Sequence, residues 1–62
     1  MHRKSRKANT MEYIFDIYRQ KGETPSVKDT WLGRRYTTYF EIAKEVNRMN
    51  DLNDCNIYFI RV

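Results

Sequence analysis

The sequence predicts an α+β fold, a small ββαβ domain in which one helix packs on a three-stranded antiparallel sheet. Three observations lead to this prediction. Residues 11–19 place apolar side chains at alternate positions, residues 38–49 open with a helix-capping motif and continue with helical spacing, and residues 57–62 form an apolar and aromatic run. A disordered basic N-terminal arm, residues 1–10, is expected to precede the single folded domain, residues 11–62.

The first strand is predicted over Met11–Arg19, which is rich in Tyr, Ile and Phe. In a strand, four apolar side chains share one face: Met11, Tyr13, Phe15 and Ile17. The other face combines Glu12 and Asp16 with Ile14 and Tyr18. A helix that begins after Thr10 fits the same segment, but the composition favours the strand.

A turn and a weaker strand candidate follow. Gly22 and Pro25 predict the turn, because both residues interrupt regular structure. Val27–Leu32 is the second strand candidate, since it holds strand-favouring residues such as Trp31. Gly33 is expected to end it, and the three residues after Gly33 either begin a short return or lead into the helix.

The helix is predicted over Tyr39–Met49. Thr38 and Glu41 form an S/T-x-x-E capping box, which satisfies two backbone donors at a helix start. Apolar residues then recur at helical spacing: Tyr39, Ile42, Ala43, Val46 and Met49. Asn50-Asp51 is the predicted end of the helix.

The last strand, residues 57–62, is apolar on both faces, and such strands are usually central in a sheet. One helix covers only one face of a three-stranded sheet. The other face would expose a contiguous apolar set: Ile14, Tyr18, Tyr58, Ile60 and Val62. Because a patch of that size normally marks a contact surface, a second copy, a partner protein or a nucleic acid is expected to cover it.

Sixty-two residues allow one domain at most, and a domain this small is marginally stable alone. Cys55 is the only cysteine and His2 the only histidine, so neither an intrachain disulfide nor a zinc site is expected, and no cofactor is implied. A homodimer or a complex with a protein partner is expected to add stability. The sequence holds neither a signal-peptide pattern nor a membrane-length apolar run, which favours a cytoplasmic protein without a membrane partner.

The net charge of the chain resides in the predicted arm. Arg3, Lys4, Arg6 and Lys7 contribute four positive charges, which equals the formal net charge of +4 of the whole chain. The other eight Lys and Arg residues are balanced by eight Asp and Glu residues. The arm therefore predicts a polyanion, DNA or RNA, or an acidic protein surface as the partner.

Arg34, Arg35 and Tyr36 form a second candidate nucleic-acid site, because arginines contact phosphates and a tyrosine can stack on a base. In a strand the two arginines would point to opposite faces. The alternative is a solvated turn in which Tyr36 packs under the helix.

The other aromatic residues divide between core and interface. Tyr13 and Tyr39 are expected in the core, whereas Tyr18 and Tyr58, with Ile60, are candidates for a protein interface. Trp31 is a core residue in one interpretation and an interface anchor or stacking platform in the other.

No catalytic constellation is apparent in the sequence. Glu41 and Glu45 have simpler capping and pairing roles on the helix, and Cys55 has no histidine in the folded part to activate it. The only two glycines cannot build a phosphate-binding loop. An enzyme is therefore not expected.

Three stretches resemble small uncharacterised proteins encoded by phages and mobile elements: Asp29–Tyr36, Asn47–Asn50 and Ile57–Val62. Those proteins show a D-T-x-x-G turn, a helix ending near an asparagine and a closing aromatic strand. The resemblance implies a small accessory protein and suggests no activity.

A second resemblance competes with the first. Gln20–Asp29 is similar to the junction between the first two helices of winged-helix repressor heads of the SOS type. It would make Tyr39–Met49 a recognition helix and imply that Arg34, Arg35 and the following threonines face DNA.

Together these features predict a non-enzymatic, nucleic-acid-associated accessory protein, encoded by a phage or mobile element, whose basic arm contacts phosphates. The alternative is a protein-binding inhibitor or adaptor that docks on a host enzyme through the apolar sheet face or a sheet edge.

Overall fold

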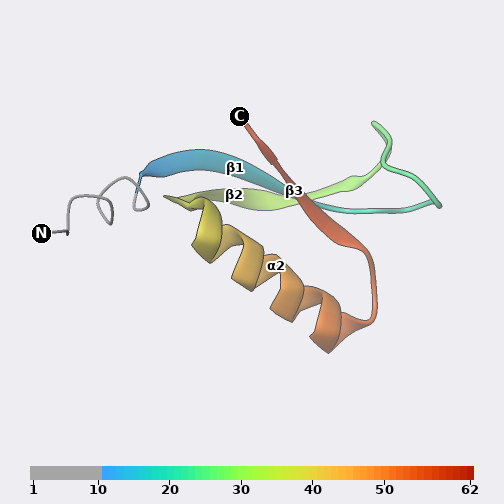
Figure 1. Ribbon diagram of the computed structural model, residues 1–62. Coiled ribbons are helices and arrows are strands. Elements are labelled where there is room, and N and C mark those ends of the chain that lie inside the picture. The colour runs from blue at the N-terminus through green and yellow to red at the C-terminus, as the bar shows by residue number, and fades with distance from the viewer. Residues whose placement is uncertain (1–10) are drawn as a thin grey trace, which may run out of the picture.

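The structure, a computed structural model, describes residues 11–62. Its elements follow in the order β1 (Glu12–Arg19), β2 (Thr30–Thr38), α2 (Tyr39–Asn53) and β3 (Ile57–Arg61), as Figure 1 shows. The three strands form one antiparallel sheet in the order β2-β1-β3. The predicted α+β fold of ββαβ order is confirmed, while the predicted arm, residues 1–10, lies outside the described residues.

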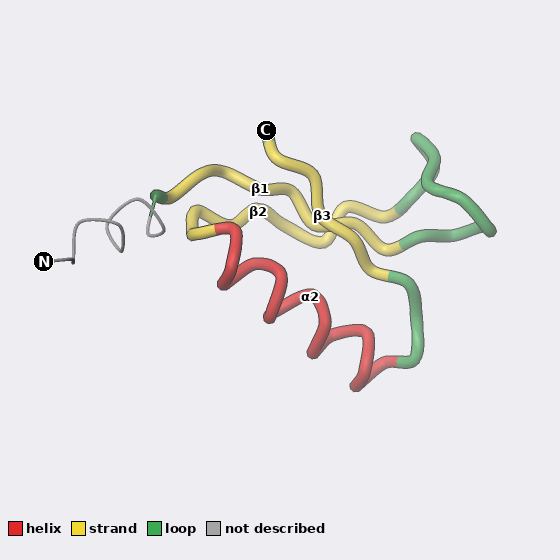
Figure 2. Tube along the Cα trace, viewed as in Figure 1, coloured by secondary structure: helices red, strands yellow, loops and turns green. Residues whose placement is uncertain are grey.

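The described residues make two layers, with α2 against one face of the sheet (Figure 2). Five buried side chains form the core, and they come from β1, α2 and β3: Phe15, Ile17, Ile42, Val46 and Ile57. Because the side chains of a strand alternate between its faces, the burial of Phe15 and Ile17 directs the residues between and beside them to the opposite face. Within residues 11–62, no helix or strand covers that second face, and the loop between β1 and β2 lies against one end of it.

The central strand is β1, not the closing strand, so the prediction of a central β3 is wrong. The hairpin places β2 beside β1, and the segment through α2 returns β3 to the other side of β1. The apolar outer side of β3 is therefore exposed surface, and Ile60 and Val62 lie largely in solvent.

β2 differs from its predicted bounds, because it begins at Thr30 and continues through Gly33 to Thr38. The register shifts there, since Ile17 pairs with Gly33 but Tyr18 pairs with Trp31, which leaves Leu32 as the extra residue of a bulge. Gly33 adopts a φ of 138°, which only glycine reaches easily. Glycine therefore carries the strand through the bulge instead of ending it, and the residues after it continue β2.

The helix begins where the capping box predicts. The Thr38 hydroxyl oxygen accepts a hydrogen bond from the Glu41 backbone N–H at 3.1 Å. The helix runs beyond the predicted end at Asn50-Asp51 to Asn53, where Asp54 adopts a left-handed conformation and donates its N–H to the Asn50 carbonyl at 2.9 Å.

The side chain of Asn50 explains why the helix does not end there. Its Oδ1 accepts from the Ile57 N–H at 2.6 Å, and its Nδ2 donates to the Ile57 carbonyl at 3.0 Å. Asparagine usually ends a helix because its side chain competes for the hydrogen bonds of the helix backbone. The Asn50 amide binds β3 instead, so this competition is absent.

The helical alternative for Met11–Arg19 is wrong, because this segment is the central strand. The winged-helix arrangement requires a helix at that point. Its implication that Tyr39–Met49 is a recognition helix therefore loses its structural basis.

Candidate functional site

The face of the sheet opposite α2 is the candidate functional site, and we call it the outer face. It collects residues from all three strands: Ile14, Asp16, Tyr18, Trp31, Arg34, Tyr36, Tyr58 and Ile60. Strand alternation and the pairing register bring them together. Of the candidate binding residues predicted from the sequence, Arg35 alone among those that the structure describes lies on the other face.

Three aromatic side chains cross the outer face in one row, one from each strand. Tyr18 of β1 pairs with Tyr58 of β3 on one side and with Trp31 of β2 on the other. The Tyr18 and Tyr58 rings are stacked, with centroids 5.5 Å apart and planes 18° apart. Trp31 is 57% exposed, so the interpretation of Trp31 as a core residue is wrong. We call these three residues the aromatic row.

A second row of large side chains lies toward the start of β1. Ile14 pairs with Tyr36, and its carbonyl accepts a hydrogen bond from the Val62 N–H at 2.8 Å. Tyr36 is 70% exposed. The expectation that Tyr36 packs under the helix is wrong, because its partner Ile14 lies on the outer face.

An ion pair separates the two rows. Arg34 donates from Nε to Asp16 Oδ1 at 2.7 Å and from Nη2 to Asp16 Oδ2 at 3.1 Å. The hydrogen bond from Arg34 lowers the pKa of Asp16 below its ordinary value, and the same bond raises the pKa of Arg34. This two-point contact neutralises the guanidinium within the face.

Arg35 lies on the helix side of the sheet, as strand alternation requires. Its Nε donates to Glu45 Oε2 at 3.0 Å, and its Nη1 donates to the Arg34 carbonyl at 3.2 Å. Arg34, Arg35 and Tyr36 therefore do not form one joint site, since the two arginines occupy opposite faces and each already binds a carboxylate.

Two tyrosines were expected in the core. Tyr13 is half-buried and packs against the core, and the Arg61 guanidinium lies over its ring at 4.0 Å. Tyr39 is 62% exposed, so its assignment to the core is wrong. As the first residue of α2 it borders the core, with edge contacts to Phe15 and Phe59.

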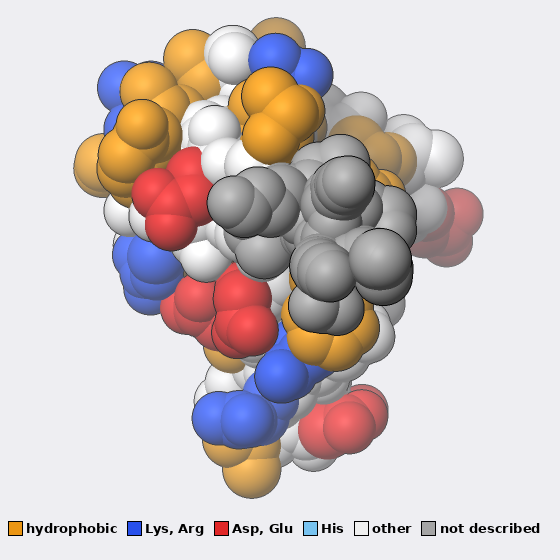
Figure 3. Space-filling view, turned by 60° about the vertical axis from the view of Figure 1, so that its left-hand side comes forward, with side chains coloured by type: hydrophobic (Ala, Val, Ile, Leu, Met, Phe, Trp, Pro, Cys, Tyr) orange, Lys and Arg blue, Asp and Glu red, His pale blue; other side chains and the backbone are white. Residues whose placement is uncertain are grey.

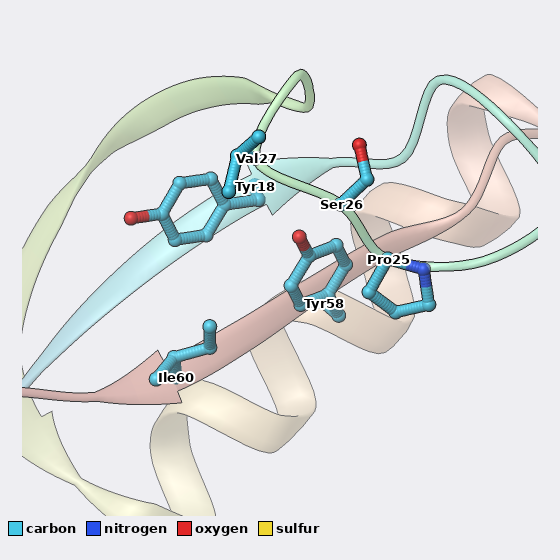
Figure 4. A pocket seen from close by; sticks show the side chains of 6 residues that line it. All are labelled: Tyr18, Pro25, Ser26, Val27, Tyr58 and Ile60. Carbon is cyan, nitrogen blue, oxygen red and sulfur yellow. The ribbon is translucent and has the colours of Figure 1, made fainter.

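A hollow of about 480 Å³ opens between the outer face and the β1–β2 loop. Figure 4 shows Tyr18 on β1, Tyr58 and Ile60 on β3, and three loop residues that complete the wall: Pro25, Ser26 and Val27. None of these six side chains is charged. Sequence reasoning missed the loop residues as site residues, because no local pattern predicts that the loop folds over the sheet.

Asp29 holds this loop in place. Its carboxylate accepts the backbone N–H groups of Lys21 at 3.0 Å and Ser26 at 2.9 Å, and it accepts the Tyr58 hydroxyl at 2.5 Å. The Tyr58 hydroxyl bond is the largest cause that lowers the pKa of Asp29, and the same bond raises the pKa of Tyr58 to about 12. The aromatic row and the loop are thereby joined at Tyr58.

Within residues 11–62, no three His, Cys, Asp or Glu side chains gather as they would around a metal ion. No helix within the same residues has the length and apolar character to cross a membrane. Figure 3 shows basic, acidic and hydrophobic side chains interspersed on the face that it presents.

The candidate contacts at Arg3, Lys4, Arg6 and Lys7 lie outside the described residues. Comparisons of the chain with protein-family models, with curated proteins and with solved structures gave no match. The outer face and the hollow therefore stand as the basis for a function.

Proposed function

We propose that this protein is a non-enzymatic binding protein that holds single-stranded nucleic acid on the outer face of its sheet. One observation carries the proposal. Trp31 and Tyr36 are mostly exposed on the same sheet face as the stacked Tyr18 and Tyr58. Aromatic side chains spread over an open sheet form stacking platforms for unpaired bases.

An unpaired strand suits this face better than a duplex does. The major groove of a duplex admits a helix or a two-stranded ribbon, whereas the outer face is three strands wide. In a duplex the base faces are also already stacked on one another. A single strand leaves them available to the aromatic row.

Phosphate contacts are assigned to the arm. Arg34 and Arg35 are each paired with a carboxylate, and Asp16 and Arg34, the charged residues of the outer face, cancel each other. The arm joins the sheet at Met11, where Glu12 pairs with Thr38, close to Tyr36 and Ile14. Its four basic residues, Arg3, Lys4, Arg6 and Lys7, would contact the backbone of a strand lying on the face.

The test is fluorescence anisotropy with labelled single-stranded RNA, single-stranded DNA and duplex DNA. We expect Trp31→Ala and Tyr36→Ala each to weaken single-strand binding by roughly five- to 150-fold, which corresponds to about 1–3 kcal/mol per stacked base. Phe40→Ala is the matched control, because Phe40 is an equally exposed aromatic on α2 (65%). Replacing the four basic arm residues by Gln should reduce the slope of log affinity against log salt by about 3.

The proposal fails if no single strand binds. It fails equally if Phe40→Ala costs as much affinity as Trp31→Ala, since binding would then not be located on the outer face.

A protein-binding adaptor is the second candidate, and the composition of the second row favours it. Tyr36, Ile14 and Val62 make an apolar strip beside an ion pair that is already neutral, as in the centre of a protein interface. Such a partner would be a host enzyme or a second copy. Sedimentation of the full chain tests for the second copy. Under this function Val62→Ala should disrupt the complex, whereas neutralising the arm should only slow its formation.

A further inference from the structure

The hollow stands at one end of the aromatic row, because Tyr18 and Tyr58 belong to both. Its volume of about 480 Å³ lies in the range of small-molecule sites, which are mostly apolar with a few polar groups. We infer that the hollow is a pocket for one unpaired nucleobase of the bound strand. This inference rests on the proposed function and deepens it.

The chemistry of the wall suits a neutral, planar group. The two tyrosine rings offer aromatic surface, and Pro25, Val27 and Ile60 offer apolar contacts (Figure 4). A base therefore finds ring surface and apolar edges in the same hollow.

The polar groups of the hollow suit the edge of a base. Ser26 Oγ accepts the Lys28 backbone N–H at 3.0 Å, so its own proton remains available for donation. The Tyr58 hydroxyl is already bound to Asp29, which leaves Ser26 and Tyr18 as the hydroxyls that can read a base.

Charge excludes an anionic group from the hollow itself. None of its lining side chains is cationic, and the Asp29 carboxylate lies next to it, bound to the Tyr58 hydroxyl. The same loop carries Lys21 and Lys28, both exposed, and neither makes an ion pair with a carboxylate of residues 11–62. This distribution of charge suits a neutral base inside the hollow and phosphates beside the two lysines outside it.

The pocket is also built before a ligand arrives. Asp29 accepts three hydrogen bonds, and its own N–H donates to the Ser26 carbonyl at 3.2 Å. These bonds fix the loop over the sheet. A preformed wall lowers the ordering cost of binding.

The test combines an abasic scan with a variant of the wall. The probe is the shortest single-stranded oligonucleotide that keeps full affinity for the full chain, because a short probe cannot slide. Each base is removed in turn. We expect removal at one position to cost at least about tenfold in affinity, in keeping with the loss of a stacked base.

Val27→Glu is the wall variant, because Val27 is fully exposed and its replacement leaves the core intact. We expect it to weaken binding of the intact probe about tenfold and to abolish the penalty at the sensitive abasic position. Leu52→Glu is the matched control, since Leu52 is an exposed aliphatic on α2 with the same change of charge. It should leave the penalty intact.

The failures are distinguishable. If the intact probe binds through Trp31 but no abasic position depends on Val27, the pocket is refuted and the proposed function stands. If the intact probe does not bind at all, both are refuted.

Discussion

Single residues on the outer face derive their roles from pairing across the sheet. Arg34 and Arg35 are neighbours in sequence, yet the first binds Asp16 on the outer face and the second binds Glu45 on the helix side. Both guanidinium charges are neutralised by carboxylates of the domain itself. A run of two arginines is therefore a weak indicator of a phosphate site when it lies within a strand.

Tyr58 is the residue whose chemistry departs most from that of a solvated side chain. Its hydroxyl donates to Asp29, which raises the pKa of Tyr58 from 10.0 to about 12. Since the folded pKa is the higher one, the stabilising effect of this contact is complete below about pH 10 and is lost as the pH rises toward 12. For Asp29 the folded pKa is lowered, so its effect is present above the ordinary value of 3.8 and is lost as the pH falls below it.

We expect an NMR titration of tyrosine ring carbons to find Tyr58 ionising near pH 12. Asp29→Asn should return the pKa of Tyr58 toward 10.0, because the charged acceptor is gone. Asp51→Asn removes an exposed carboxylate from α2 and should leave the pKa of Tyr58 where it was. Native Tyr58 ionising near pH 10 would contradict the contact.

At the scale of elements, the link between α2 and β3 depends on Asn50. Its side-chain amide makes two hydrogen bonds to the backbone of Ile57, a buried residue of the core. In a wider sheet, a neighbouring strand would bind the N–H and C=O groups that Ile57 here offers to Asn50. Asn50 thereby covers part of the edge of β3, which is one way in which proteins protect a sheet edge from unwanted pairing.

We expect Asn50→Ala to lower the free energy of unfolding by about 1–3 kcal/mol, since the polar groups of Ile57 would lose their partner. Asn47→Ala changes an exposed asparagine of the same helix and should cost less than about 0.5 kcal/mol. Urea unfolding of the full chain measures both values. Equal costs would show that the bonds to Ile57 contribute nothing.

At the scale of the whole molecule, local sequence patterns predicted the first strand and the start of the helix. Alternation in Met11–Arg19 predicted the face that Phe15 and Ile17 share in the core, and the Thr38 capping box predicted where the helix starts. The sequence also predicted a sheet face that the helix leaves uncovered. The first two follow from residues within a few positions of one another, and the third follows from the presence of one helix beside three strands.

The remainder depends on contacts between distant segments. β1 is central because the β1–β2 loop places β2 on one side of it and the segment through α2 places β3 on the other. The apolar composition of β3 alone had predicted a central β3. The ion pair of Asp16 with Arg34 spans 18 residues, and the bond of Tyr58 to Asp29 spans 29. The latter bond joins the two sides of the hollow, the β1–β2 loop and the outer face.

The measurement that tests the central claim most directly is an NMR titration of the isotope-labelled full chain with a short single-stranded oligonucleotide. Binding on the outer face predicts shifts of the Trp31 indole N–H and of the amides of Tyr18, Tyr36 and Tyr58, with α2 residues such as Phe40 and Lys44 unchanged. Shifts confined to α2, or no shifts at all, would contradict the assignment of the outer face to nucleic acid.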